Sequence, residues 1–450
     1  MRRASLLIVP LSLLSTLPAR ANGRFPETNQ LVVEPGDPDH AVARATFGLL
    51  VTRDRGASWE FVCEDAFGPQ NTDPPLALLP GGVLVLGLDR GVSKSDVLGC
   101  TFELARGIDG PVLDVTASTE EPGTAFVLTA DDASSYVWIS TDAAASFEQV
   151  GRIAGLSAVT LDVAPSSSDV LYLSGVEGDD GVLYRSDDRG LSFERFTIPG
   201  ASSSKVPYIA AVDPTDANTV YVRTYGIPGA LLQTRDGGRT FSERPLEMRT
   251  PVQGFALSGD GSVIVASNPF DGTFRAARER FEFEPIRCGG ASCLAFADED
   301  LLGCGSESLD GFVIGISRDG GETFSPLLAQ SCIPGPVGCP EASGVDRECA
   351  NTWPELRARL GAERCEPIDV EPEAGCFGSS GAGGTESLPE IPANAGGDTY
   401  GPIAATSETG SSAGCSCGTT GSSRHTESVW SLAVLSLVRR ARQRSRVARS

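Results

Sequence analysis

TRDGGRTF, residues 234–241, places two adjacent glycines between a charged turn and an aromatic residue. The chain contains four further copies of this octet: TRDRGASW at 52–59, STDAAASF at 140–147, SDDRGLSF at 186–193 and SRDGGETF at 317–324. All five fit the pattern Ser/Thr-x-Asp-x-Gly-x-Ser/Thr-aromatic, except that Ala144 replaces the glycine of STDAAASF. A motif that returns along a chain indicates a repeat architecture, in which each copy occupies the same place in its own structural unit.

The aromatic residue that ends each octet shows the length of the repeating unit. A slipped copy ends at Phe102, and a copy that has lost the motif keeps Phe281. The seven aromatic residues lie 40 to 48 residues apart: Trp59, Phe102, Phe147, Phe193, Phe241, Phe281 and Phe324. Each period consists of short β-rich runs bounded by Gly, Asp, Ser or Pro, without a helical pattern. The sequence therefore predicts an all-β protein, a seven-bladed β-propeller of four-stranded blades over residues 22–330.

The octet resembles the Asp box, or BNR repeat, found in sialidases, sortilin-like receptors, xyloglucan hydrolases and many exported propellers. We place it at the turn between the third and fourth strands of each blade, where glycine supplies a positive φ. A short aspartate can accept backbone N–H bonds in such a turn, and Ser/Thr hydroxyls can cap further groups. We expect a structural role for the aspartates of the five copies: Asp54, Asp142, Asp188, Asp236 and Asp319.

The resemblance also raises the question of glycosidase activity. Sialidases hold an anionic sugar carboxylate with three arginines on inner strands and use a Tyr/Glu nucleophile pair. The predicted inner strands, for example VLDVT and TLDVA, contain no arginine, which disfavours sialidase activity.

A hydrolase of neutral polysaccharide needs only two carboxylates across a cleft. Asp114 and Asp162 occupy matching positions on the inner strands of blades three and four, and Asp213 and Asp298 lie nearby in theirs. In noncatalytic relatives with similar strings this aspartate caps the following turn, and we favour that interpretation. The alternative, catalysis by Asp114 and Asp162, stays open.

Composition limits the other classes of site. The chain has only two histidines, which disfavours a His-ligated zinc site or a His-based triad. Its net charge of -23 disfavours binding to nucleic acid or anionic lipid. We expect no cofactor and no metal site. The one alternative is Ca²⁺ at an acidic rim of loops between second and third strands, formed by Asp131, Asp132, Glu177, Asp179, Asp180, Asp271, Glu307 and Asp310.

The N-terminus reads as a signal peptide over residues 1–21, with two arginines, an apolar run and a small-x-small site that predicts cleavage between Ala21 and Asn22. Twelve cysteines in an exported chain indicate a disulfide framework. Residues 331–376 are predicted to form a small Cys-rich module around one helix at residues 353–360. Residues 377–414 form a Gly/Ser/Pro linker.

The last segment, residues 415–450, has three parts: Cys415 and Cys417, a short apolar run at residues 429–438, and an arginine cluster. It resembles the MYXO-CTERM sorting signal, which implies processing by a protease of the myxosortase type and a lipoprotein-like anchor at the cell surface or outer membrane. A disordered basic tail on a periplasmic or freely secreted protein is the alternative.

We therefore expect a noncatalytic binding propeller at the cell surface, with an extracellular protein or carbohydrate ligand, no nucleic acid, and membrane contact only through the C-terminal anchor. The first alternative is a glycoside hydrolase acting on neutral polysaccharide. The second is a maturation or assembly factor for another exported protein.

Overall fold

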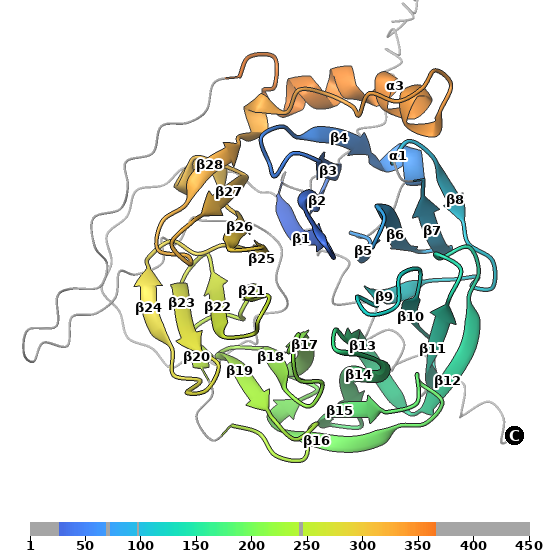
Figure 1. Ribbon diagram of the computed structural model, residues 1–450, viewed down its shortest axis with the longest axis vertical. Helices are drawn as coiled ribbons and strands as arrows, with labels where there is room; N and C mark the ends of the chain where they lie inside the picture. The colour runs from blue at the N-terminus through green and yellow to red at the C-terminus, as the bar shows by residue number, and fades with distance from the viewer. Residues whose placement is uncertain (1–26, 69–72, 97–98, 243–245, 366–450) are drawn as a thin grey trace, which may run out of the picture.

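Seven four-stranded antiparallel sheets surround a central axis in the computed structural model (Figure 1). The structure describes residues 27–68, 73–96, 99–242 and 246–365. The strands of each sheet are hydrogen-bonded in chain order, and the first strands of successive sheets contact one another around the axis. The predicted seven-bladed β-propeller is confirmed.

The blades have the following strands. Blade 1 has β1 (Thr28–Glu34), β2 (Asp37–Ala45), β3 (Gly48–Thr52) and β4 (Glu60–Cys63), and blade 2 has β5 (Leu76–Leu79), β6 (Val83–Leu88), β7 (Gly91–Ser95) and β8 (Phe102–Leu104). Blade 3 has β9 (Val112–Ala117), β10 (Ala125–Ala130), β11 (Ser134–Ser140) and β12 (Glu148–Ala154). Blade 4 has β13 (Leu156–Ala164), β14 (Ser167–Glu177), β15 (Asp180–Ser186) and β16 (Glu194–Ser202). Blade 5 has β17 (Val206–Val212), β18 (Val220–Tyr225), β19 (Gly229–Thr234) and β20 (Leu246–Met248). Blade 6 has β21 (Gly254–Leu257), β22 (Val263–Asn268), β23 (Gly272–Ala277) and β24 (Glu284–Arg287), and blade 7 has β25 (Cys293–Ala297), β26 (Asp300–Cys304), β27 (Ile314–Ser317) and β28 (Ser325–Leu328).

The core lies between neighbouring blades, so the middle strands are covered on both faces. Their sequences are accordingly continuous apolar runs, such as GLLVT in β3 and VLVLGL in β6, and nearly every residue in them is buried. The aromatic residue of the octet packs against the preceding blade: Phe147 shares a hydrophobic cluster with Val85 and Val92 of blade 2. In the same way Trp59 of blade 1 shares a cluster with Ile316 of blade 7, which joins the two ends of the ring.

Blades 1 and 7 are each built from consecutive strands, so no sheet in the described part of the chain combines strands from both ends of the propeller. Two of the hydrogen bonds between these blades involve Thr28. The Thr28 hydroxyl donates to the carbonyl of Val313 over 3.0 Å, and the Ser292 hydroxyl donates to the carbonyl of Thr28 over 2.9 Å. Ring closure therefore depends on side chains and packing here, and on the segment that follows β28.

Residues 330–365, which we call the clasp, cross from blade 7 over the outer edges of blades 1 and 2 (Figure 1). The clasp contains a short 3-10 turn (Gln330–Cys332) and the helix α3 (Gly344–Arg359). The backbone N–H of Phe61 donates to the carbonyl of Gly335, and that of Val337 donates to the carbonyl of Phe61, both over 2.9 Å. The clasp thus adds a short parallel pairing to β4 of blade 1.

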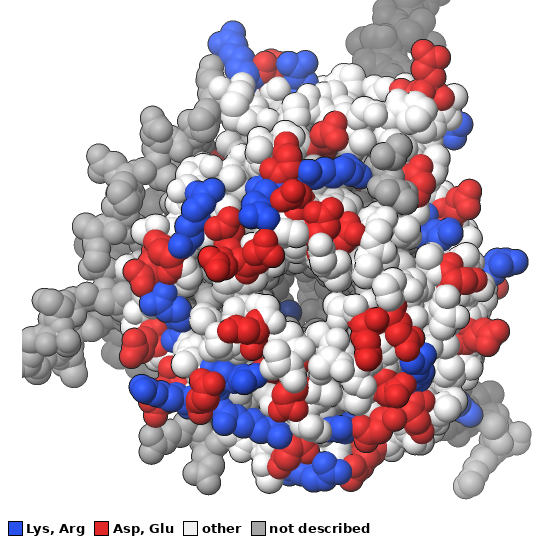
Figure 2. Space-filling view, in the orientation of Figure 1, with Lys and Arg blue, Asp and Glu red and all other residues white. Residues whose placement is uncertain are grey.

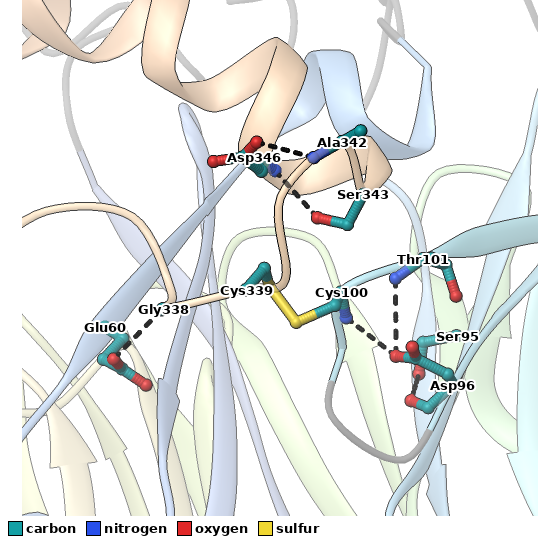
Figure 3. The surroundings of a disulfide bond; sticks show 10 residues. All are labelled: Glu60, Ser95, Asp96, Cys100, Thr101, Gly338, Cys339, Ala342, Ser343 and Asp346. Atoms are coloured by element: carbon teal, nitrogen blue, oxygen red, sulfur yellow. Dashed lines mark hydrogen bonds between the residues drawn. A yellow bond between two sulfur atoms is a disulfide. The ribbon is translucent and has the colours of Figure 1, made fainter.

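Disulfides fix the clasp to the propeller. Cys349 in α3 bonds to Cys63 at the end of β4, and Cys339 bonds to Cys100 beside β8 (Figure 3). A third bond, Cys332–Cys365, lies within the clasp, and Cys293–Cys304 joins β25 to β26 within blade 7. The predicted disulfide framework is confirmed. Because two of its bonds lead to blades 1 and 2, this segment is attached to the propeller rather than held only by its own cysteines.

The helix of the clasp is longer than predicted. We expected residues 353–360, whereas α3 begins at Gly344, where the Ser343 hydroxyl accepts the backbone N–H of Asp346 over 3.1 Å (Figure 3). The buried face of the first turns consists of Val345 and Cys349, and a cysteine does not stand out as part of an apolar helical period. Two further helices, α1 (Glu64–Phe67) and α2 (Glu307–Asp310), are single turns. None of the helices within the described residues has the length and apolar character of a membrane span.

Candidate functional site

The five octets form turns between third and fourth strands, and each aspartate bonds within its own turn. In blade 4, Asp188 accepts the Ser186 hydroxyl over 2.7 Å, the backbone N–H of Ser192 over 2.8 Å and the Ser192 hydroxyl over 2.6 Å. The equivalent three bonds recur at Asp54, Asp142, Asp236 and Asp319. The oxygens of these carboxylates therefore already accept hydrogen bonds within the turn, which is the structural role we expected for them.

Hydrogen bonds to the charged form set the acidity of these groups. The hydroxyl and backbone N–H of Ser192 lower the pKa of Asp188 below its ordinary value. At Asp142 the hydroxyl of Ser146 is the main cause, and the pKa falls to about 2. The turn also needs two residues at positive φ, which are Arg189 and Gly190 in blade 4. Blade 3 uses Ala143 and Ala144 there, at φ of 54° and 59°.

The two candidate catalytic carboxylates lie on inner strands, Asp114 in β9 and Asp162 in β13, and both connect blade 3 to blade 4. Asp114 accepts the backbone N–H of Leu161 across the blades and that of Val115 in its own strand, both over 2.9 Å. In the opposite direction the Thr116 hydroxyl donates to Asp162 over 3.1 Å. The predicted matching positions are wrong: Asp114 pairs with Leu128, three residues beyond the Ala125–Ser140 pair of its blade, whereas Asp162 pairs with Tyr172, one residue beyond the equivalent Leu171–Ser186 pair. The two carboxylates are nevertheless close enough to interact electrostatically.

Burial weakens both carboxyl groups of this pair as acids. Burial raises the pKa of Asp114 to about 7 and that of Asp162 to about 6. The negative charge of Asp162 adds to the effect on Asp114, while its two backbone hydrogen bonds and the positive charge of Arg44 oppose it. Near neutral pH, Asp114 therefore exists in both protonation states.

Asp213 and Asp298, expected on inner strands near that pair, lie instead in the turns that follow β17 and β25. Asp213 is fully buried, accepts the backbone N–H of Thr215 over 2.9 Å and pairs with Arg278 over 3.2 Å. Asp298 is exposed and pairs with Arg55 over 3.0 Å. The strand ends come earlier than the sequence suggested, because an aspartate followed by proline or by Glu-Asp begins a turn rather than continuing a strand.

The acidic loops between second and third strands bond mainly to neighbouring arginines and to their own turns. Arg195 contacts both Glu177 and Asp180, Arg249 lies 2.7 Å from Asp271, and Arg287 lies 2.7 Å from Asp310. Asp131 accepts the backbone N–H groups of Ala133 and Ser134, each over 2.8 Å. Over the described ranges, no three His, Cys, Asp or Glu side chains form a group suited to a metal ion. Calcium binding at this rim stays an untested expectation.

An open cavity of about 260 Å³ lies where the inner strands of blades 4 to 7 end. Its lining is almost entirely apolar: Pro165, Ala211, Val212, Pro214, Phe255, Ala256, Leu257, Ser258, Gly259, Leu294, Ala295 and Phe296. Figure 2 shows one face of the ring, on which several acidic side chains border a central hollow and most basic side chains lie farther out. Sequence analysis missed the cavity because apolar residues at strand ends read as core, and only half-exposed rings such as Phe255 and Phe296 distinguish it.

No protein-family model matches this chain, and no curated protein matches its sequence. Solved structures are similar in fold. A GH74 enzyme from Niastella koreensis is 14% identical with a TM-score of 0.40, covering 66% of this chain and 65% of its own. An ancestral GH74 enzyme is 16% identical with a TM-score of 0.44, covering 60% and 39%. Hydrazine synthase from Kuenenia stuttgartiensis is 11% identical with a TM-score of 0.52, covering 67% and 99%.

This chain thus spans less than two thirds of the two GH74 chains it matches. At these identities the similarities show the propeller fold alone, on which many unrelated functions occur.

Proposed function

We propose that this chain is an exported propeller of the Asp-box type that binds an extracellular protein or carbohydrate without catalysing a reaction. The observation that carries the proposal is that Asp114 and Asp162, the inner-strand carboxylates, are engaged in hydrogen bonds between blades 3 and 4. Both oxygens of Asp114 accept backbone N–H groups, and Asp162 accepts a hydroxyl from the neighbouring blade. Neither of them lines the cavity described above. A pair engaged in holding two blades together is poorly placed to exchange protons with a substrate.

The cellular setting belongs to the same proposal. A signal peptide removed after Ala21 would export the chain, and a MYXO-CTERM-like tail processed near Cys415 or Cys417 would attach it to the cell surface. Both segments lie outside the described residues. Intact-mass analysis of the protein from its native membrane fraction tests this part: loss of residues 1–21 with a new lipid-bearing end near Cys415 supports it. An unprocessed arginine tail without added mass contradicts it.

A glycoside hydrolase is the second candidate, favoured by one observation. The pKa of Asp114, raised by burial to about 7, is what a general acid requires at neutral pH. The partner carboxylate of such an enzyme stays ionised, and Asp162, whose pKa burial raises to about 6, would be mostly ionised at neutral pH. The hydrogen bonds that both carboxylates make between the blades still favour the noncatalytic proposal.

Incubation of the purified chain with a panel of neutral polysaccharides and aryl glycosides separates the two functions. The noncatalytic proposal predicts no released sugar above that of a heat-denatured sample. Turnover that Asp114→Asn or Asp162→Asn abolishes, in variants that remain folded by circular dichroism, would establish the hydrolase instead.

A further inference from the structure

Seven turns join the first and second strands of the blades, and we call them the inner turns. All are described, and they contain acidic residues but no Lys or Arg. The acidic residues are Glu120, Glu121, Asp213, Asp216, Asp260, Asp298 and Glu299. Pro165, Pro214, Ser258 and Gly259, which line the apolar cavity, belong to the same turns. The cavity therefore opens among acidic loops.

Arginines from neighbouring turns reach three of these carboxylates. Arg55 pairs with Asp298, Arg189 with Glu121 and Arg278 with Asp213. Within the described ranges, no Lys or Arg forms an ion pair with the remaining four, which are Glu120, Asp216, Asp260 and Glu299. Glu120 belongs to blade 3, outside the cavity lining, and the positive charge of Arg278 acts on Asp216. Asp260 and Glu299, in the inner turns of blades 6 and 7, are the carboxylates of the cavity-lining blades that keep negative charge after the local ion pairs.

Asp260 holds its charge across the physiological range. The Ser258 hydroxyl donates to it over 2.6 Å and the backbone N–H of Ser262 over 2.9 Å. With the Ser262 hydroxyl, these bonds lower the pKa of Asp260 to about 2. Asp260 directly follows Gly259 of the cavity wall, so a fixed negative charge lies beside an apolar opening.

The composition of the mouth selects among ligand classes. Phe255, Leu257 and Phe296 leave apolar surface in contact with water, and covering such surface is favourable. Nucleic acid and anionic lipid are repelled by the carboxylates. A polypeptide that carries an apolar side chain between cationic ones satisfies both parts of the surface at once.

We propose that this mouth binds an extended, basic peptide segment of a partner protein, in which a Leu-sized or aromatic side chain enters the cavity and flanking Lys or Arg residues contact the inner turns. The inference rests on the proposed binding function and names its partner class. The apolar side chain supplies most of the affinity, and the carboxylates on Asp260 and Glu299 supply charge selectivity.

Fluorescence anisotropy of the full chain with the labelled, amidated peptide Gly-Lys-Arg-Leu-Arg-Lys-Gly tests the inference. We expect saturable binding that weakens with salt, because exposed charges are screened. Replacing Leu by Ser in the peptide should weaken binding roughly tenfold to hundredfold, the effect of burying one such side chain. Replacing the four basic residues by Glu should abolish it.

Gly259→Phe is the decisive protein variant. A Cβ at Gly259 meets no heavy atom within 4 Å, so the ring can occupy the cavity mouth without disturbing the fold. Binding should weaken by roughly tenfold or more. Gly338→Phe, also placed in open space but on the clasp, is the matched control and should bind as the unaltered chain does. The double variant Asp260→Asn, Glu299→Gln should lose part of the affinity and most of the salt dependence.

Equal affinity for the Leu and Ser peptides, or unchanged binding by Gly259→Phe, would overturn the inference, because attraction would then be purely ionic or located elsewhere. Absence of any peptide binding would also overturn it, and would leave the noncatalytic function intact. Sugar release in the glycoside panel would overturn that function without bearing on the peptide site, so the two failures can be told apart.

Discussion

Blades 4 and 2 form the same turn, between third and fourth strands, in different ways. In blade 4 the octet is complete, and Asp188 satisfies the turn through Ser186 and Ser192 alone. In blade 2 the motif has slipped. Asp96 still accepts the backbone N–H of Cys100 over 2.7 Å, but Cys100 is also bonded to Cys339 of the clasp (Figure 3).

The difference indicates how the ring is held together. Turns with an octet are stabilised by bonds among neighbours in sequence, which form wherever the turn forms. The blade 2 turn is held by a segment more than 200 residues away in the chain, since the Cys100–Cys339 separation is 239. That segment also joins blade 7 to blade 1. The clasp therefore joins blade 7 to blade 1 and also supports, in blade 2, one of the two turns that lack a regular octet.

Removing the covalent clasp should have the largest effect on stability. Replacing Cys63, Cys100, Cys339 and Cys349 by alanine removes two bonds and should lower the free energy of unfolding by about 4–5 kcal/mol for each of them, because both close very long loops. Replacing Cys293 and Cys304, separated by 11 residues, is the control and should cost about 2–3 kcal/mol. Urea denaturation measures both. Equal losses would mean that ring closure does not depend on the clasp.

Breaking a complete octet should have an intermediate effect. Asp188→Ala removes the acceptor for three donors and should cost about 1–2 kcal/mol. Asp187→Ala, the neighbouring residue that only pairs with Arg185, is the control and should cost less than about 1 kcal/mol. Thermal denaturation compares the two. An Asp188 variant as stable as the control would contradict the role we give to the octet.

The pH dependence of stability should differ between the aspartates of the octet turns and Asp114 on the inner strand of blade 3. The octet aspartates have lowered pKa values, so their contribution is present above the ordinary aspartate pKa and is lost as pH falls toward about 2 at Asp142. Asp114 has a raised pKa, so its contribution is present below about pH 4 and is lost as pH rises through about 7.

The variant Asp114→Asn isolates the pH-dependent contribution of Asp114 to stability. Relative to this variant, the unaltered chain should become progressively less stable between pH 4 and pH 7, since the folded state binds more protons than the unfolded state over that window. Chemical denaturation at several pH values gives the difference. A stability difference that is constant with pH would show that burial does not raise the pKa of Asp114.

The smallest effect concerns the octet without glycine. Ala143 lies at a φ of 54°, where an L-residue is strained, so Ala143→Gly should raise the free energy of unfolding by about 0.5–1 kcal/mol. Ala145→Gly is the control in the same turn; its φ is not positive, and it should be neutral or destabilising. Stabilisation by both variants would mean that strain at residue 143 is not the cause.

The sequence predicted the features of the fold that repeat, such as the blades, but not those that occur once, such as the clasp. Seven aromatic positions at a regular spacing determine the number of blades, because each aromatic residue packs, fully or partly buried, in a cluster with the preceding blade. The clasp could not be predicted in the same way: ten cysteines before the linker allow many pairings, and spacing does not choose among them.

The candidate sites show the same contrast. Asp114 and Asp162 were correctly placed on inner strands because those strands repeat. Their matching positions, and the placement of Asp213 and Asp298, were predicted wrongly because strand registers and strand ends vary from blade to blade. The cavity among the inner turns has no motif, since it consists of ordinary apolar residues that four blade ends leave partly uncovered.

Hydrogen exchange is the most direct test of the central claim. The claim is that octet turns are stabilised by hydrogen bonds among their own residues, whereas the blade 2 turn depends on the clasp. The measurement compares the chain with the variant lacking both clasp disulfides, under conditions where both are folded. We predict that the amides of Phe61, Thr101 and Val337 lose protection, while those of Ser146, Ser192 and Thr240 in the octets keep it. Equal loss of protection in the octet turns, or unchanged protection at Thr101, would contradict the account.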